Sequence, residues 1–387
     1  MNAILKAIPF RTPALSYVLE VIRTRYPFKI SYRPRHAHSL TVLLLSGLEA
    51  LRTSQGVFCA AASKAYTACW IRDQLYSTLP YYYLGEFGEF RKGIWIVFDI
   101  FHKHKNKIEH IICHPPKYGH EFIHAKFHPE TLEEVTPEWG HHQLDAIGLF
   151  LFIVSFAEEQ KISVIRDHKD KEILQLLVQY LTAVRFWEHS DNGMWEEGMD
   201  RHASSIGACV RGLSYIKDRG LAVVPMSLIY NGYKALDELL PNETGTRDVD
   251  MAQLSLIWPY GVVTKEIADT ILEKVEKKLV QKNGLNRYLD DNYYRSQNGV
   301  SGEWTMGFFW LSIIYAERND MKQAEYWFNR GLATMTPEGH LPELYYNGIP
   351  NDNTPLAWSH ALAIIAERML HIYRPLTKKE SVKASLP

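Results

Sequence analysis

The chain has 387 residues, of which 46% are hydrophobic and 22% are charged, and its 43 lysines and arginines nearly balance 44 aspartates and glutamates. A near-neutral chain with no long basic run is not expected to bind nucleic acid or an anionic membrane through its net charge. No apolar run reaches roughly 18 residues, the minimum for a membrane span, and the four cysteines form no C-x-x-C pair, so we expect a soluble, cytoplasmic protein with free thiols.

Helical periodicity dominates the chain from residue 38 to residue 373. Segment 264–282 carries many charges and predicts an outer helix, whereas 202–217 and 303–317 are rich in small and aromatic residues and predict inner helices. The predicted helices cover 38–52, 74–84, 86–104, 141–160, 170–188, 202–217, 225–240, 250–258, 264–282, 303–317, 320–334 and 355–373.

No linker divides 38–373, so we interpret this range as one domain. Residues 1–37 are expected to form an N-terminal appendage with a helix near 13–25 and a strand at 28–32, without the apolar core of a secretion signal. Apolar residues within 106–135 predict a β-hairpin insertion. Residues 374–387 are expected to be a C-terminal tail.

Acidic and aromatic residues gather just before the predicted inner helices. If six inner helices stand in a ring with these leading loops at one end, the loops meet in a single bowl. The sequence therefore predicts an all-α fold, an (α/α)6 toroid of six helical hairpins, with the hairpin insertion at its rim. The residues expected to line the bowl are Trp70, Arg72, Asp73, Trp139, Gln143, Asp145, Trp195, Glu196, Glu197, Arg287, Trp304, Glu343 and Trp358.

Carboxylates set beside tryptophans suit a sugar-cleaving pocket. A carboxylic acid must protonate the leaving oxygen, a carboxylate must activate water, and flat apolar rings must hold the sugar. Simpler roles remain open at this point. Glu196 and Asp145 could be helix-start carboxylates, and Glu343 could be an exposed loop acid. Arg72 and Arg287 could serve in ion pairs, and the tryptophans could fill the core.

Five motifs resemble those of glycoside hydrolase family 15, the glucoamylase-like inverting α-glucosidases. The resemblance extends over roughly residues 38–372, and it implies the toroid and makes 38–373 a catalytic domain. The motifs are 70–73 (WIRD), 142–146 (HQLDA), 195–197 (WEE), 287–294 (RYLDDNYY) and 355–359 (PLAWS).

The resemblance implies a role for each carboxylate. Glu196 corresponds to the general acid, and Glu343, which stands ahead of the 355–359 motif, corresponds to the general base. Arg72 and Asp73 correspond to residues that hold the hydroxyls of the terminal glucose, although Asp73 is also a rival or supporting base. Glu197 is expected to bind the leaving sugar or to support the acid, and the remaining residues of the bowl are expected to bind substrate.

The expected activity is exo-acting hydrolysis of a terminal α-glucosyl residue with inversion, which releases β-glucose and requires no cofactor. Bacterial members of the family usually carry an N-terminal β-sandwich, for which this chain has no room, and no starch-binding module is present. We therefore expect a short substrate such as isomaltose or another isomalto- or malto-oligosaccharide.

Other functions fit the same motifs. An α,α-trehalase would use the same toroid with different loops, and a non-catalytic sugar-binding or regulatory toroid would need no turnover. A phosphorylase is disfavoured because the sequence shows no obvious anion-binding nest. Histidines between 110 and 128 match no zinc-site spacing, so no metal is expected. The sequence leaves the oligomeric state open.

Overall fold

The computed structural model describes residues 36–137, 139–297 and 299–373. The expected helix at 13–25, the strand at 28–32 and the tail at 374–387 lie outside these residues. The described α-helices are α2 (His36–Glu49), α3 (Ile71–Leu84), α4 (Phe87–Lys103), α5 (Lys105–Cys113), α6 (Leu144–Glu159), α7 (His168–Ala183), α8 (Ala203–Asp218), α9 (Met226–Leu239), α10 (Leu254–Ile257), α11 (Lys265–Lys278), α12 (Met306–Glu317), α13 (Met321–Leu332) and α14 (Ala357–Tyr373).

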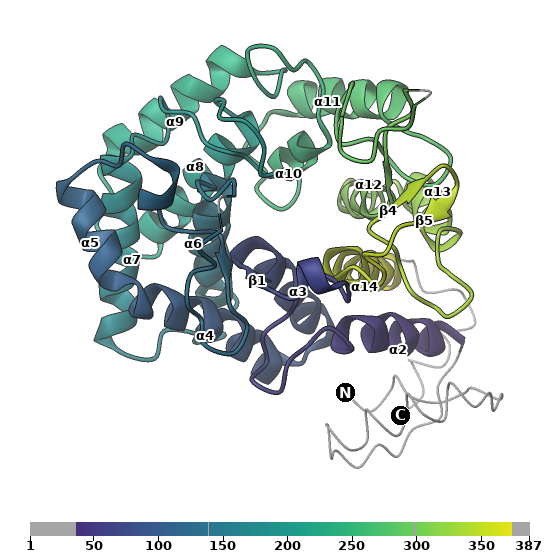
Figure 1. Ribbon diagram of the computed structural model, residues 1–387, viewed down its shortest axis with the longest axis horizontal. Coiled ribbons are helices and arrows are strands. Elements are labelled where there is room, and N and C mark those ends of the chain that lie inside the picture. The colour runs from purple at the N-terminus through teal and green to yellow at the C-terminus, as the bar shows by residue number, and fades with distance from the viewer. Residues whose placement is uncertain (1–35, 138, 298, 374–387) are drawn as a thin grey trace, which may run out of the picture.

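The helices form two concentric rings (Figure 1). In the inner ring α3, α6, α8, α10, α12 and α14 contact one another in that order, and α14 closes the ring by packing on α3. The outer helices α4, α7, α9, α11 and α13 each pack on the inner helix that precedes them, and α2 packs on α14. This arrangement is the predicted (α/α)6 toroid.

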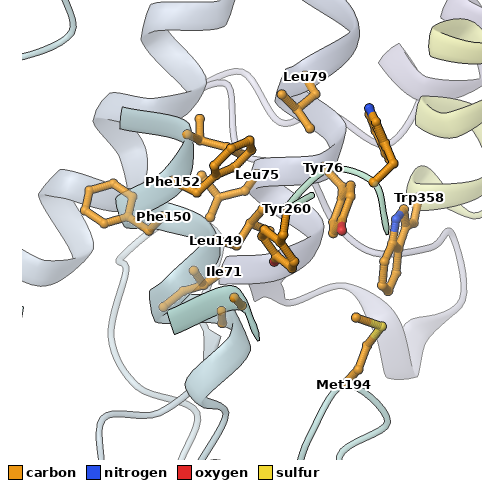
Figure 2. Packing of buried hydrophobic residues seen from close by; sticks show 14 of the residues in the cluster. Ile71, Leu75, Tyr76, Leu79, Leu149, Phe150, Phe152, Met194, Tyr260 and Trp358 are labelled. Carbon is orange, nitrogen blue, oxygen red and sulfur yellow. The ribbon is translucent and has the colours of Figure 1, made fainter. Parts of the chain in front are cut away.

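The burial of each helix follows its composition. In the charged outer helix α11 the buried residues are Ala268, Ile271, Leu272 and Val275, which form a single stripe at helical spacing. In the inner helix α12 nearly every residue is buried, because neighbours cover it on all sides. Figure 2 shows the same dense packing where Tyr76 of α3 stacks on Trp358 of α14, with their ring centroids 4.6 Å apart.

The β-hairpin predicted over 106–135 is wrong for its first part and confirmed only as a short turn-back at 126–135. Residues 105–113 form α5, which packs on α7, since Ile108 and Ile111 lie one helical turn apart and bury their side chains together. The strand within this range, β2 (Lys126–Phe127), pairs antiparallel with β1 (Cys69–Trp70). On its other side Phe127 forms an isolated antiparallel bridge with Glu134, so 126–135 turns back on itself as a short hairpin. The segment nevertheless reaches the rim of the bowl, because β1 leads directly into α3.

A small three-stranded sheet adjoins the bowl. It consists of β3 (Glu303–Trp304), β4 (Leu344–Tyr346) and β5 (Ile349–Pro350), in the order β3-β4-β5. Asn347 and Gly348 both have positive φ, as a two-residue hairpin turn between β4 and β5 requires. The pairing of Trp304 with Leu344 sets Glu343 next to the start of α12.

Short 3₁₀ turns complete the described structure: η1 (Lys64–Tyr66), η2 (Gly119–Glu121) and η3 (Met251–Gln253). The helix predicted at 250–258 is thus divided between η3 and α10. None of the helices within the described residues has the length and apolar character to cross a bilayer.

Candidate active site

A cavity of about 430 Å³ opens where the loops before the inner helices meet. Gln143 and Asp145 do not line this cavity, although they were predicted to do so. The predicted residues that do line it are Trp70, Arg72, Asp73, Trp139, Trp195, Glu196, Glu197, Arg287, Trp304, Glu343 and Trp358. The cavity is also lined by residues that were not predicted from the sequence, namely Ala60, Ala65, Tyr66, Met194, Tyr293 and Leu356.

Glu196 lies in the loop between α7 and α8, and its backbone adopts the left-handed conformation with φ of 62°. That conformation is uncommon for residues other than glycine and costs roughly 1–3 kcal/mol. The Oε2 atom of Glu196 accepts a hydrogen bond from Nε1 of Trp139, a half-exposed rim residue. Its Oε1 atom lies 3.7 Å from Nη1 of Arg72.

Glu343 is almost completely buried, with a relative exposure of 1%. Its Oε2 atom accepts hydrogen bonds from the side-chain amides of Asn351 at 2.6 Å and Asn353 at 2.7 Å. Burial raises the pKa of Glu343 above its ordinary value, although the two amides and the hydroxyl of Tyr66 act in the opposite direction. The hydroxyl of Tyr66 also lies 2.9 Å from that of Tyr293.

Arg72 is held along one edge of its guanidinium group. Nε donates to Oδ2 of Asp145 at 2.6 Å, and Nη2 donates to Oδ1 of Asp145 at 3.1 Å and to Oε1 of Gln143 at 2.7 Å. Gln143 and Asp145 stand at the start of α6, so their function in the site is to hold Arg72. The remaining donors, on Nη1, lie on the side of Glu196.

Asp73 lies in the first turn of α3, and its carboxyl group reaches the cavity. Burial raises its pKa, Arg72 opposes this, and the nearby carboxyls of Glu196 and Glu343 raise it further, to about 7. Three carboxyl groups from three separate parts of the chain therefore share one cavity and influence one another electrostatically.

Glu197 points into an ionic network beside the pocket. It accepts hydrogen bonds from Arg287 at 2.8 Å and from the hydroxyl of Tyr288 at 2.7 and 2.8 Å, and it pairs with Arg247 at 3.3 Å. Arg287 also makes a bidentate pair with Asp291, with both distances 2.7 Å. This network fixes Arg287 against the aromatic wall of the cavity.

Aromatic rings form that wall. Trp195 lies between Trp304 and Trp358, with ring centroids 5.7 and 6.4 Å away, and Nε1 of Trp195 donates to Asp250 at 2.8 Å. Within the described residues Nε1 of Trp304 and of Trp358 is buried without a hydrogen-bond partner. These rings therefore both fill the core and face the cavity, so the two roles considered for them are compatible.

Trp70 and Trp139 also line the cavity, Trp70 buried and Trp139 half-exposed. Nζ of Lys126 in β2 lies 4.5 Å from the centroid of each ring, within the range of a cation–π contact. Lys126 was missed because its role depends on the pairing of β1 with β2. Asn351 and Asn353 were missed for a similar reason, since loop asparagines are common and only the fold brings them to Glu343.

In the described part of the chain, no group of three or more His, Cys, Asp or Glu side chains is placed to hold a metal ion. The polar and aromatic groups that line the cavity are carboxyl groups, arginines, tyrosines and tryptophans. Such a set can bind a hydroxyl-rich ligand, donate a proton from one side and accept one on another.

The toroid and its pocket define a glycosidase-type fold. Residues 37–303 match glycosyl hydrolases family 15, and the protein belongs to that family. Among solved structures it is similar to a wild-type glycosidase, with a TM-score of 0.73 at 19% identity over 95% of this chain and 100% of the other. It is also similar to a variant glycosidase in complex with glucose, with a TM-score of 0.72 at 19% identity over 95% of this chain and 100% of the other. For glucoamylase from Saccharomycopsis fibuligera the TM-score is 0.63 at 14% identity, over 88% of this chain and 96% of the other.

Curated relatives include proteins of a different kind. A probable phosphorylase b kinase regulatory subunit alpha from Caenorhabditis elegans is 25% identical over 301 residues, which cover 63% of this chain and 24% of the relative. The skeletal muscle isoform of this subunit from Oryctolagus cuniculus is 27% identical over 192 residues, which cover 44% of this chain and 15% of the relative. The chain spans a quarter or less of the length of these two relatives.

Proposed function

We propose that the protein is an exo-acting hydrolase that removes a terminal α-glucosyl residue from short oligosaccharides with inversion and releases β-glucose. The observation that carries the proposal is that Glu196 and Glu343, which correspond to the acid and the base by their motifs, line one cavity together with Arg72 and Asp73. Trp139 holds the carboxyl group of Glu196, and Asn351 and Asn353 hold that of Glu343.

In the proposed reaction, protonated Glu196 donates its proton to the glycosidic oxygen and the bond to the anomeric carbon breaks. Ionised Glu343 removes a proton from a water molecule that attacks the opposite face of that carbon. Inversion in one step requires carboxyl groups about 6.5–9.5 Å apart, which leaves room for this water. Both side chains return to their starting states by exchanging protons with solvent.

The remaining residues of the site receive binding roles in this proposal. Arg72 and Asp73 hold hydroxyls of the terminal glucose, since a charged donor and a carboxylate form strong, directed hydrogen bonds to hydroxyls. The rings of Trp195, Trp304 and Trp358 provide the apolar surface, and Trp70 and Trp139 contact the sugar nearer the mouth. Glu197 and Arg287 bind the leaving sugar.

A short substrate is supported by the rim. The half-exposed Trp139 donates a hydrogen bond to Glu196, and Lys126 of β2 lies against the rings of both Trp70 and Trp139. These groups narrow the approach to the acid, which favours isomaltose or maltose over a long chain. The α,α-trehalase alternative would use the same toroid, so only the substrate that is hydrolysed would distinguish it from the proposed enzyme.

Proton NMR of the purified protein with isomaltose, maltose, panose and trehalose tests the proposal. Early β-glucose from one of these substrates is expected, and its loss in Glu196→Gln and Glu343→Gln is the internal control. Glu266→Gln, an exposed residue of α11, is the matched control and should keep full activity. A disaccharide substrate also releases its second glucose, which contributes α-anomer whatever the mechanism. Early glucose with more α-anomer than that second sugar accounts for, or turnover that survives both catalytic substitutions, would overturn the proposal.

A second candidate is a sugar-binding regulatory toroid, and it is favoured by the names of the curated relatives. It predicts that glucose or a disaccharide binds with measurable heat in calorimetry while no substrate is hydrolysed. Turnover abolished by Glu343→Gln would exclude it.

A further inference from the structure

Asp191 is a buried carboxylate behind the pocket, with a relative exposure of 1%. Its Oδ1 atom lies 2.9 Å from Nδ1 of His202, and its Oδ2 atom accepts hydrogen bonds from Ser205 Oγ at 2.8 Å and from the backbone N–H of Leu144 at 3.0 Å. Leu144 is the first residue of α6, while His202 and Ser205 stand at the start of α8. One carboxylate therefore joins the beginnings of two neighbouring inner helices.

The same residue closes the loop that carries Glu196. The backbone of Asp191 exchanges two hydrogen bonds with that of Asp200, at 2.9 and 3.0 Å. The next residue, Asn192, donates from its side-chain amide to the carbonyl oxygen of Glu197 at 2.6 Å. Glu196 thus lies within a short loop that is closed by the backbone pairing of Asp191 with Asp200.

The ring of His202 packs closely against Gly193 in this loop. Gly193 has a φ of 62°, and a Cβ atom built there would lie 2.8 Å from Cε1 of the His202 ring. The ring is therefore the surface on which the first turn of the loop rests. The left-handed backbone of Glu196 persists only if such surroundings fix it, because unsupported strain of this kind relaxes.

Electrostatics strengthen the Asp191–His202 contact. Burial disfavours a charged imidazole, but the hydrogen bond and charge of Asp191 outweigh burial and raise the pKa of His202 to about 9. Burial acts to raise the pKa of Asp191, yet its interactions with His202 and Ser205 lower it below its ordinary value. Both groups are charged near neutral pH, which gives a charge-assisted hydrogen bond.

We propose that the buried Asp191–His202 pair positions Glu196 as proton donor, by fixing the base of its loop to the starts of α6 and α8. The proposal rests on the proposed hydrolysis, and it adds two positioning residues that touch no substrate. Gln143 precedes α6 and Asp145 lies in its first turn, and both bind Arg72. The Asp191–His202 pair therefore also fixes the position of Glu196 relative to Arg72.

The test compares two substrates that differ in their need for an acid. Isomaltose or maltose has a poor leaving group, and protonation by a positioned acid contributes about 10²–10⁴-fold. α-Glucosyl fluoride has a leaving group that departs with little protonation. We expect His202→Leu to lower kcat/KM on the disaccharide at least about 100-fold and on the fluoride less than about 10-fold.

Two further variants and one control complete the design. His202→Asn keeps an N–H donor near the position of Nδ1 and should recover most of the disaccharide activity. Ser205→Ala removes a single donor from Asp191 and provides a milder variant if His202→Leu does not fold. His189→Leu, an exposed histidine near the same loop, should change neither rate.

The outcomes are separable. If the wild-type protein hydrolyses neither substrate, the proposed function fails. If it hydrolyses both, and His202→Leu and Ser205→Ala reduce both rates by the same factor or leave both unchanged, the positioning proposal fails while the function stands. A selective loss on the disaccharide with recovery in His202→Asn supports it.

Discussion

Replacement of Arg72 by methionine would separate its two structural tasks. Arg72 and Asp145 are 3% and 1% exposed, and Arg72→Met would leave the Asp145 carboxylate buried without its cation. Removing one partner of such a pair typically costs about 3–5 kcal/mol, because the remaining charge loses its compensation. We expect the free energy of unfolding to fall by about that amount.

Removal of both charges should restore most of the stability. In Arg72→Met/Asp145→Leu no buried charge remains at this position, and an apolar pair of similar volume is often neutral in stability. Activity should not return, since Nη1 of Arg72 is the part of the group nearest Glu196 and lines the cavity. Loss of a hydrogen bond from a charged donor corresponds to about 1.5–3 kcal/mol, or roughly 10- to 150-fold in kcat/KM.

Urea unfolding followed by tryptophan fluorescence, together with disaccharide kinetics, measures both effects. Arg219→Met is the control, because Arg219 pairs with Glu159 where both side chains are at least 32% exposed, and such pairs contribute only about 0.2–1 kcal/mol. A loss of less than about 1 kcal/mol in Arg72→Met would show that Asp145 does not depend on this cation, and a double variant that loses as much stability as the two single variants combined would show that the two side chains are not coupled.

Three other predictions test single contacts. Asn353→Ala removes an amide that lowers the pKa of Glu343, so the acidic limb of the kcat/KM profile should move to higher pH; an unmoved limb would argue against Glu343 as base. His202 has a pKa of about 9 in the folded protein against about 6.5 when unfolded, so its contribution to stability is complete below about pH 6.5 and disappears as pH rises through about 9. Melting temperatures from pH 6 to 10 should show this decline, and it should be absent in His202→Asn. Gly140→Ala would place Cβ 2.5 Å from the carbonyl oxygen of Glu196 and should reduce activity, whereas Gly198→Ala, where a Cβ has no neighbour within 4 Å, should not.

The toroid could be predicted because each helix carries its own burial pattern. The stripe of Ala268, Ile271, Leu272 and Val275 marks α11 as an outer helix before any contact is known. The prediction failed over 106–113 because so short an apolar run is ambiguous between helix and strand. The deciding signal is the burial of Ile108 and Ile111, which lie three residues apart and share a face only in a helix. Strand β2 has only two residues, and its partner lies far back in the chain.

The lining of the pocket could be predicted because it comes from loops with distinctive pairs of residues, such as Trp195 with Glu196. The residues that tune these side chains were out of reach. Asn351, Asn353 and Tyr66 act on Glu343 only through contacts that the completed ring creates. Gln143 and Asp145 were predicted to line the pocket, but their side chains bind Arg72 instead of facing the cavity, since a motif identifies residues and not the direction in which they point.

The surroundings of Glu343 also bear on whether the toroid acts on sugar or only binds it. Both amides donate to the same oxygen, Oε2, so a glutamine with its oxygen at that position would keep both hydrogen bonds. Burial raises the pKa of Glu343, which means that the ionised form destabilises the folded protein relative to a neutral group of the same shape. Glu343→Gln should therefore raise the melting temperature at pH 7 while it abolishes turnover, and the gain should vanish as pH falls and the wild-type carboxyl becomes protonated. If Glu343 had only a structural role, replacing it with glutamine would not raise the melting temperature, because a destabilising carboxylate is retained only where function requires it. Equal or lower stability of Glu343→Gln at pH 7 would contradict this argument and favour the regulatory alternative.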